Sequence, residues 1–239
     1  MLTEDIMEVE SHKHLGVYLS NDCSWHTHIE YIKTKAWGRV NIMRKLKYVL
    51  DRKSLETIYL SFIRPLLEYS DVIWDNCTSI QKYELEKIQY EAARIATGST
   101  KLVSIKQLEM ETGWEALESR RLKHKLVLFF KMVTNQTPAY LSALVPPLVG
   151  EESRYNLRNT ENIQLVHART KLYSESFLPS VIREWNCLPL YVRNSSSTAS
   201  FKLAISGSSR IIPTYYFVGN RKAQILHTRL RTNCSSINL

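Results

Sequence analysis

One group of side chains near the N-terminus has the residue types that bind metal ions. Cys23, His26 and His28 lie close together and could present one sulfur and two imidazole nitrogens at the start of a helix. A tetrahedral zinc site needs four donors, usually in two close pairs, and no second cluster of Cys and His lies nearby in the sequence. The pattern therefore favours surface histidines at the start of a helix, and we expect no metal site.

The sequence offers no recognisable set of catalytic groups. It lacks a glycine-rich phosphate loop, a GxSxG nucleophile motif and an HExxH motif. The neighbouring acids Glu109 and Glu111, like Glu151 and Glu152, are typical of exposed turns. We therefore expect no catalytic residues and no cofactor.

Basic side chains form two candidate phosphate-binding groups. Arg120, Arg121 and Lys125 should share one flank of a helix, where they can contact phosphates, although a solvated helix face is the alternative. The second group lies near the C-terminus, has no acids beside it, and consists of Arg221, Lys222, Arg229 and Arg231. Residues 215–217, Tyr-Tyr-Phe, could stack on bases next to this group or could serve only in packing.

The overall charge also indicates a polyanionic partner. The 239 residues carry 32 Lys and Arg against 23 Asp and Glu, a formal net charge of +9. Residues 201–239 hold six basic side chains and no acid, which favours nucleic acid over an acidic membrane surface. Four widely spaced cysteines and an acidic N-terminus without a signal peptide predict an intracellular protein, cytoplasmic or nuclear and not secreted. The longest apolar run, residues 126–130, is too short to cross a membrane.

Apolar spacing predicts the elements that position these groups. Residues 8–20 should form a β-hairpin, and residues 24–47 a helix with Lys33 and Arg39 on its polar face. Two further helices should follow in residues 54–98, where Pro65 should bend the first and Gly98 should end the second. The apolar residues expected to be buried are Ile29, Ile32, Ala36, Val40, Met43 and Leu46 in the first helix, and Leu55, Ile58, Tyr59, Phe62, Ile63 and Leu66 in the second.

The rest of the chain predicts helices in residues 104–111, 114–135, 176–187, 199–205 and 220–231, the last capped by Asn220. The buried side of the 114–135 helix should include Leu117, Leu122, Leu126, Phe129, Phe130 and Val133. The expected fold is mainly α, a helical thumb-like bundle with a small N-terminal β-hairpin and a looser basic C-terminal region. The expected boundaries are a hairpin in 1–22, a helical domain in 23–145 and an irregular or helical basic region in 146–239.

Several short motifs, in this order, resemble the region after the catalytic palm in reverse transcriptases of non-LTR (LINE-type) retrotransposons. The N-terminal ones are HLGV at 14–17, WxxHI at 25–29, YxSFIRPLLEY at 59–69, LEKIQ at 85–89 and ARIxxG at 93–98. The C-terminal ones are YNLR at 155–158, RTxxYxxSFxP at 169–179, RxWNxLP at 183–189 and HTRLR at 227–231. The resemblance covers nearly the whole chain.

The resemblance implies a helical thumb that holds nucleic acid by its backbone, with a primer-grip-like turn at His14, Leu15 and Gly16. A tight turn is the simpler interpretation of Gly16. The two-metal chemistry of such polymerases needs palm aspartates in a Tyr-x-Asp-Asp turn, which this sequence lacks. The palm would then lie before Met1, and a Cys/His zinc segment after Leu239.

The predicted function is therefore a non-catalytic remnant of an RNA-directed DNA polymerase. It would bind RNA or DNA backbone weakly, without sequence preference and with strong salt dependence, through the basic residues named above. The alternative is a helical interaction module that associates with itself or another protein through the face left by the missing palm. No membrane partner is expected.

Overall fold

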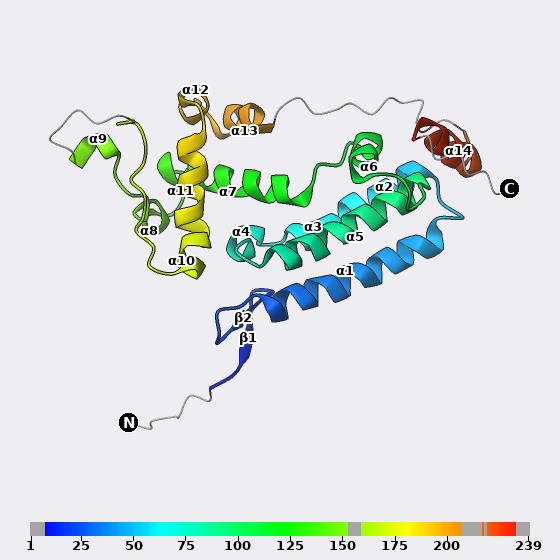
Figure 1. Ribbon diagram of the computed structural model, residues 1–239, viewed down its shortest axis with the longest axis horizontal. Helices are drawn as coiled ribbons and strands as arrows, with labels where there is room; N and C mark the ends of the chain where they lie inside the picture. The colour runs from blue at the N-terminus through cyan, green and yellow to red at the C-terminus, as the bar shows by residue number, and fades with distance from the viewer. Residues whose placement is uncertain (1–7, 153–158, 207–216, 218, 233–239) are drawn as a thin grey trace. The chain divides into compact units, whose positions relative to one another are not determined.

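The computed structural model describes residues 8–152, 159–206, 217 and 219–232 (Figure 1). The protein is mainly helical with a two-stranded N-terminal hairpin, which confirms the predicted fold class. The chain divides into two compact units, of which the first comprises Met1–Ser70, Cys77–Leu117 and Arg210–Leu239 and the second Asp71–Asn76 and Glu118–Ser209. These units divide the chain at different places from the boundaries expected at residues 22 and 145.

The hairpin pairs β1 (Ser11–His14) with β2 (Val17–Ser20) in antiparallel register, with His14 opposite Val17. Its two-residue turn has positive φ at both positions, 45° at Leu15 and 88° at Gly16, as a type I′ turn requires. The Tyr69 hydroxyl donates to the Leu15 carbonyl oxygen at 2.7 Å, and its ring lies 3.2 Å from where a Cβ on Gly16 would be. Gly16 therefore lies in a tight turn, and Tyr69, at the end of the segment that contains Pro65, holds this turn in place.

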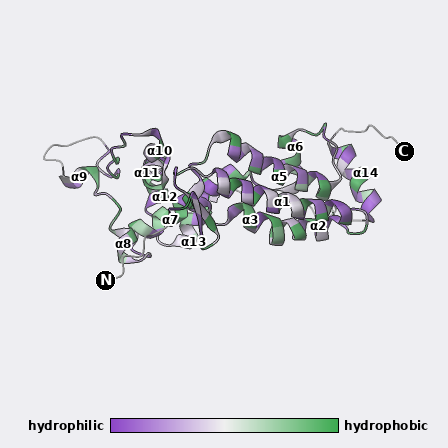
Figure 2. Ribbon diagram, turned by 90° about the horizontal axis from the view of Figure 1, so that it is seen from below, coloured by the Kyte–Doolittle hydropathy of each residue, from purple (hydrophilic) through white to green (hydrophobic). Residues whose placement is uncertain are grey.

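Helix α1 (His26–Leu46) forms where the stripe of six apolar residues predicted a helix. Five of the stripe's residues are buried, and Leu46 is half-buried. The stripe packs α1 alongside α5 (Ser79–Thr97), as Figure 1 shows. Hydrophilic and hydrophobic residues follow one another along both helices in Figure 2, which is the pattern of amphipathic helices.

The segment around Pro65 is a helix interrupted by a π-helical turn. It runs through α2 (Arg52–Ile58), η1 (Tyr59–Ile63) and α3 (Arg64–Glu68). A proline has no N–H to donate and its ring crowds the carbonyl four residues earlier, so the wider turn before Pro65 relieves both effects.

The apolar face predicted for this segment is only partly buried. Leu55, Tyr59, Ile63 and Leu67 are fully buried, at steps of four residues. Phe62, which was expected in the core, is 59% exposed because it lies beside this row. Ile58 and Leu66 are half-buried.

Both α5 and α6 (Ile105–Thr112) begin and end with the signals that their sequences carry. Each starts with a capping box, formed by Thr78 with Gln81 and by Ser104 with Gln107. Each ends at a glycine in the left-handed region, and Gly98, at φ 75°, is the predicted terminus of α5.

The second unit surrounds an aromatic core. Phe130 and Phe201 stack with ring centres 4.4 Å apart, and Phe129 meets the Trp185 ring edge-on at 5.3 Å. Val133, expected inside, is 37% exposed, while Met132 is buried in its place.

The helices of this part of the chain are α4 (Asp71–Trp74), α7 (Leu117–Val133), α8 (Ala139–Ser142), α9 (Val149–Glu152), α10 (Lys171–Glu175), α11 (Phe177–Cys187), α12 (Leu190–Arg193) and α13 (Thr198–Ser206).

The C-terminal helix α14 (Arg221–Arg231) belongs to the first unit. The Asn220 side chain accepts the backbone N–H of Ala223 at 3.0 Å, which confirms the predicted cap. Within the described residues, no helix has both the length and the apolar character that a bilayer crossing requires.

Candidate functional site

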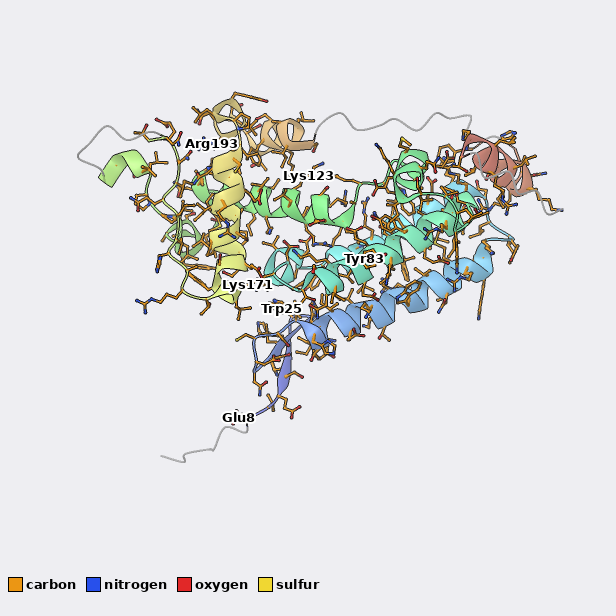
Figure 3. The ribbon with its side chains drawn as sticks, viewed as in Figure 1. Glu8, Trp25, Tyr83, Lys123, Lys171 and Arg193 are labelled. Atoms are coloured by element: carbon orange, nitrogen blue, oxygen red, sulfur yellow. The ribbon has the colours of Figure 1, made fainter. Side chains whose placement is uncertain are left out.

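The metal-ligand candidates at the start of α1 do not converge. His28 is buried, and its Nδ1 accepts the Tyr18 backbone N–H at 3.3 Å, so this histidine joins the hairpin to the helix. Burial lowers its pKa. Cys23 and His26 are exposed, and Trp25 lies beside the His28 ring where the hairpin meets α1 (Figure 3). Among the described residues, no group of three or more His, Cys, Asp or Glu side chains could hold a metal ion.

Basic and aromatic side chains gather on one flank of α1. We call this surface the cationic–aromatic flank, and it consists of Lys13, Tyr31, Lys35, Arg39 and Phe62. The Tyr31 hydroxyl oxygen accepts hydrogen bonds from Lys13 Nζ at 3.1 Å and from Lys35 Nζ at 2.6 Å. The same two nitrogens lie 4.7 and 4.4 Å from the centre of the Tyr31 ring. Two ammonium groups from the hairpin and the helix therefore meet at one phenol oxygen.

Arg39 continues the flank one helical turn beyond Lys35. Its guanidinium carbon lies 4.6 Å from the centre of the Phe62 ring, and its Nη1 donates to the Phe62 carbonyl oxygen. These contacts hold the planar cation on an aromatic ring that is itself exposed. The flank thus extends from the hairpin, along α1, to the π-helical turn.

The electrostatics of the flank favour an incoming anion. Hydrogen bonds from Lys35 and Lys13 lower the pKa of Tyr31, and the bond to Tyr31 raises the pKa of Lys13. In the part of the chain that the structure describes, Lys13, Lys35 and Arg39 form no ion pair with an acid. A phosphate oxygen is a stronger acceptor for an ammonium group than a neutral phenol is.

The residues predicted at the hairpin turn are close to this flank, but Lys33 is not part of it. His14 ends the strand β1 that carries Lys13, and Leu15 follows it in the turn; both are exposed, Leu15 at 78%. Lys33 lies on the opposite side of α1, with its Nζ 2.7 Å from Glu30 and 3.8 Å from Glu84 of α5. The helix therefore separates Lys33 from Arg39, although the sequence placed both on one polar face.

The group predicted in the middle of α7 does not form an exposed basic flank. Arg121 and Lys125 are buried, with 1% and 8% of their surface exposed. Asp75 accepts from Arg121 Nε at 2.9 Å and pairs with Lys125 Nζ at 2.6 Å. Asp75, the residue after the short helix α4, supplies this acid. Arg120 is half-buried.

The basic group near the C-terminus also has structural partners. Arg221 donates to the Ile95 and Ala96 carbonyl oxygens at the end of α5, and Arg231 Nη2 lies 2.5 Å from Glu111 Oε1. Burial, and then the charge of Arg52, lower the pKa of Arg221 to about 10. These two residues therefore hold α14 to the bundle through contacts inside the protein. Lys222 is exposed and Arg229 half-buried.

The contacts of α14 centre on a buried arginine that the sequence did not single out. Arg52 has no exposed surface, and its Nη1 lies 2.7 Å from Glu111 Oε1. Its backbone N–H donates to Gln224 of α14 at 3.1 Å. Its guanidinium carbon lies 5.2 Å from the centre of the Phe217 ring, so Phe217 packs, whereas Tyr215 and Tyr216 fall outside the described residues. The helix that begins at Arg52 is capped by Asp51, whose side chain accepts the Ser54 N–H at 3.0 Å.

The fold and the site together define a mainly helical protein with a basic, aromatic surface on its longest helix. Comparison with family models, with curated proteins and with solved structures found no match.

Proposed function

We propose that this chain derives from the reverse transcriptase of a non-LTR retrotransposon and binds the backbone of RNA or DNA without sequence preference. The ordered motifs of the sequence support the origin, and the cationic–aromatic flank supports the binding. Binding would be weak and salt-sensitive, and would take place in the cytoplasm or nucleus.

The observation that carries the proposal is the convergence of Lys13 and Lys35 on one oxygen of Tyr31. Two like charges held this close repel each other, and a bound phosphate would offset that repulsion. Arg39, about 6 Å further along the helix axis, would then meet a neighbouring phosphate. Such contacts fix position on a nucleic acid without reading its sequence.

The proposal assigns no catalysis to the chain alone. Phosphoryl transfer by two metal ions needs neighbouring carboxylates that are open to the ions. Asp75 is instead held by Arg121 and Lys125, and Asp71 lies 2.6 Å from His124 Nδ1.

Fluorescence anisotropy with a short labelled RNA tests the proposal across a salt series. The double variant Lys35→Ala/Arg39→Ala should bind less tightly, and its slope of log K against log salt should fall by about 1.4–1.8, or 0.7–0.9 per lost contact. Lys87→Ala is the matched control, because it removes an exposed lysine that α5 already pairs with Glu84 at 2.7 Å. Its affinity should equal that of the wild type.

The interaction-module alternative predicts a different result. If the chain does not bind RNA or DNA at low salt but forms dimers in sedimentation experiments, the proposal is wrong and self-association replaces it.

A further inference from the structure

A second basic and aromatic site lies at the C-terminal end of α1. A surface hollow there is lined by Asn41, Arg44, Lys45, Lys47 and Tyr48. Tyr48 is 80% exposed, and Lys47 Nζ lies 4.7 Å from the centre of its ring. Arg44 is held at the rim by Asn41 at 2.7 Å and Glu91 at 2.9 Å. The hollow therefore combines an accessible ring with the basic side chains of Lys45 and Lys47, whereas the charge of Arg44 is paired with Glu91.

The α1 sequence from the cationic–aromatic flank to this hollow carries basic residues and no acid, although Lys33 lies on the opposite side of the helix and the exposed Ile42 is apolar. Residues 31–50 contain six Lys and Arg residues and no acid. In the described part of the molecule, neither Lys45 nor Lys47 forms an ion pair with an acid from another element. An anionic chain could therefore follow α1 without meeting a carboxylate of that helix.

Gly38 stands midway along this path and has no packing role inside the protein. A Cβ added there would have no atom within 4 Å. With Lys35 three residues before it and Lys45 seven after it, it lies on one helical stripe. A mid-helix glycine costs about 0.8–1 kcal/mol relative to alanine. The missing side chain leaves room for a ligand to approach the helix closely.

We propose that the nucleic acid is single-stranded and runs along α1, from the cationic–aromatic flank across Gly38 to the hollow, where one base stacks on Tyr48. This inference rests on the proposed function and deepens it. The path from Lys35 to Lys47 is about 18 Å long at 1.5 Å per residue, enough for a strand of a few nucleotides. Along a strand, an unpaired base can offer its face to an exposed ring, whereas the bases inside a duplex are covered by their neighbours.

The first test compares a labelled single strand of about 12 uridines with an RNA duplex of the same length. The single strand should bind the wild-type chain at least about tenfold more tightly. Its salt slope should be about 0.7 per phosphate contact, against about 0.9 for a duplex. Equal or tighter binding of the duplex would overturn the inference.

The second test uses Tyr48→Ala, with Tyr83→Ala as its matched control. Tyr83 is also an exposed tyrosine, at 54%, with Lys87 Nζ 4.6 Å from its ring centre, but it lies on α5 (Figure 3). Tyr48→Ala should weaken single-strand binding by roughly 5- to 150-fold, the range expected for one stacked base. Tyr48→Phe and Tyr83→Ala should bind as the wild type does. No loss in Tyr48→Ala would contradict the stacking.

The third test blocks the path with Gly38→Leu. Leucine favours helix more than glycine does, so the thermal midpoint should not fall, yet single-strand affinity should drop at least about tenfold. Unchanged affinity would contradict the path across Gly38. If the Tyr48 and Gly38 variants bind normally while Lys35→Ala/Arg39→Ala does not, the inference fails and the proposed function stands. If the wild type binds no nucleic acid, both fail.

Discussion

At the scale of single residues, two glycines illustrate how the same substitution can have opposite effects. Gly98→Ala should destabilise the first unit by at least about 1 kcal/mol, because its φ is 75° and its Cβ would overlap the Ile225 side chain of α14. Gly38→Ala should stabilise α1 by about 0.8–1 kcal/mol, because the position is helical and open. Urea unfolding followed by circular dichroism measures both changes.

The outcome at Gly98 distinguishes the cost of backbone strain from the gain in helix propensity that alanine brings over glycine. If Gly98→Ala and Gly38→Ala shift the urea midpoint in the same direction, the positive φ of Gly98 and its contact with Ile225 do not disfavour alanine at this position.

His28 makes the hairpin's attachment sensitive to acid. Because burial lowers the His28 pKa, the unfolded chain binds a proton more readily, and stability should fall as the pH drops through about 6.5, the unfolded-state value. Protonation would also remove the acceptor of the Tyr18 N–H. The urea midpoint of the wild type should therefore fall between pH 7 and pH 5 by more than that of His28→Leu.

His26→Gln serves as the control, because His26 is exposed. This variant should keep the full pH dependence of the wild type. A His28→Leu profile as steep as the wild-type profile would show that other groups control the response.

At the scale of elements, α14 is held by ionic contacts that are stronger than those on the surface. Glu111→Ala should lower the free energy of unfolding by about 3–5 kcal/mol, because it leaves the buried Arg52 without its acid on α6 and Arg231 without a partner at 2.5 Å. Urea denaturation measures the loss.

Glu91→Ala is the comparison for an ordinary surface ion pair. Its partner Arg44 has 42% of its side chain exposed, so the cost should be below about 1 kcal/mol. If both variants lower the free energy of unfolding by the same amount, the buried contacts of Glu111 with Arg52 and Arg231 are no stronger than a surface ion pair.

The helices could be predicted from the sequence because their signals are local. The apolar stripe of α1, the capping box at Thr78 and the glycine end at Gly98 all lie within a few residues of the elements they define. The π-helical turn before Pro65 could not be predicted, because a proline sets where a helix is disturbed and not how the backbone adapts.

The candidate site could be predicted only in part, because ion pairing depends on residues distant in the chain. The sequence of its own helix predicted an exposed Arg121. The side chain is instead buried and pairs with Asp75, which lies 46 residues earlier in the chain. Conversely, the sequence did not single out Lys35, because its place in the flank depends on Lys13 of the hairpin, which binds the same tyrosine oxygen. Charge patterns along one helix cannot show which charges tertiary contacts will neutralise.

At the scale of the whole molecule, the two compact units should respond differently to loss of the C-terminal segment. Deleting residues 210–239 removes α14 from the first unit and nothing from the second. Amide hydrogen exchange should therefore speed up in α2, α5 and α6, while α11, which packs in the aromatic core of the second unit, keeps its protection.

An equal loss of protection in α11 would contradict this division of the chain. The single substitution Gln224→Ala offers a milder version of the same experiment, because it removes the acceptor of the Arg52 N–H and the amide that donates to Phe217 and Gly219 but leaves α14 in the chain.

The attachment of α14 also has a consequence for biosynthesis. Gln224 follows its partner Arg52 by 172 residues, so a ribosome adding 5–20 residues per second needs about 9–34 s to make the second after the first. Throughout that interval the nascent chain carries Arg52, and for the later part of it Glu111 as well, without helix α14, which contacts both. The first unit can therefore complete its fold only after Gln224 has been translated.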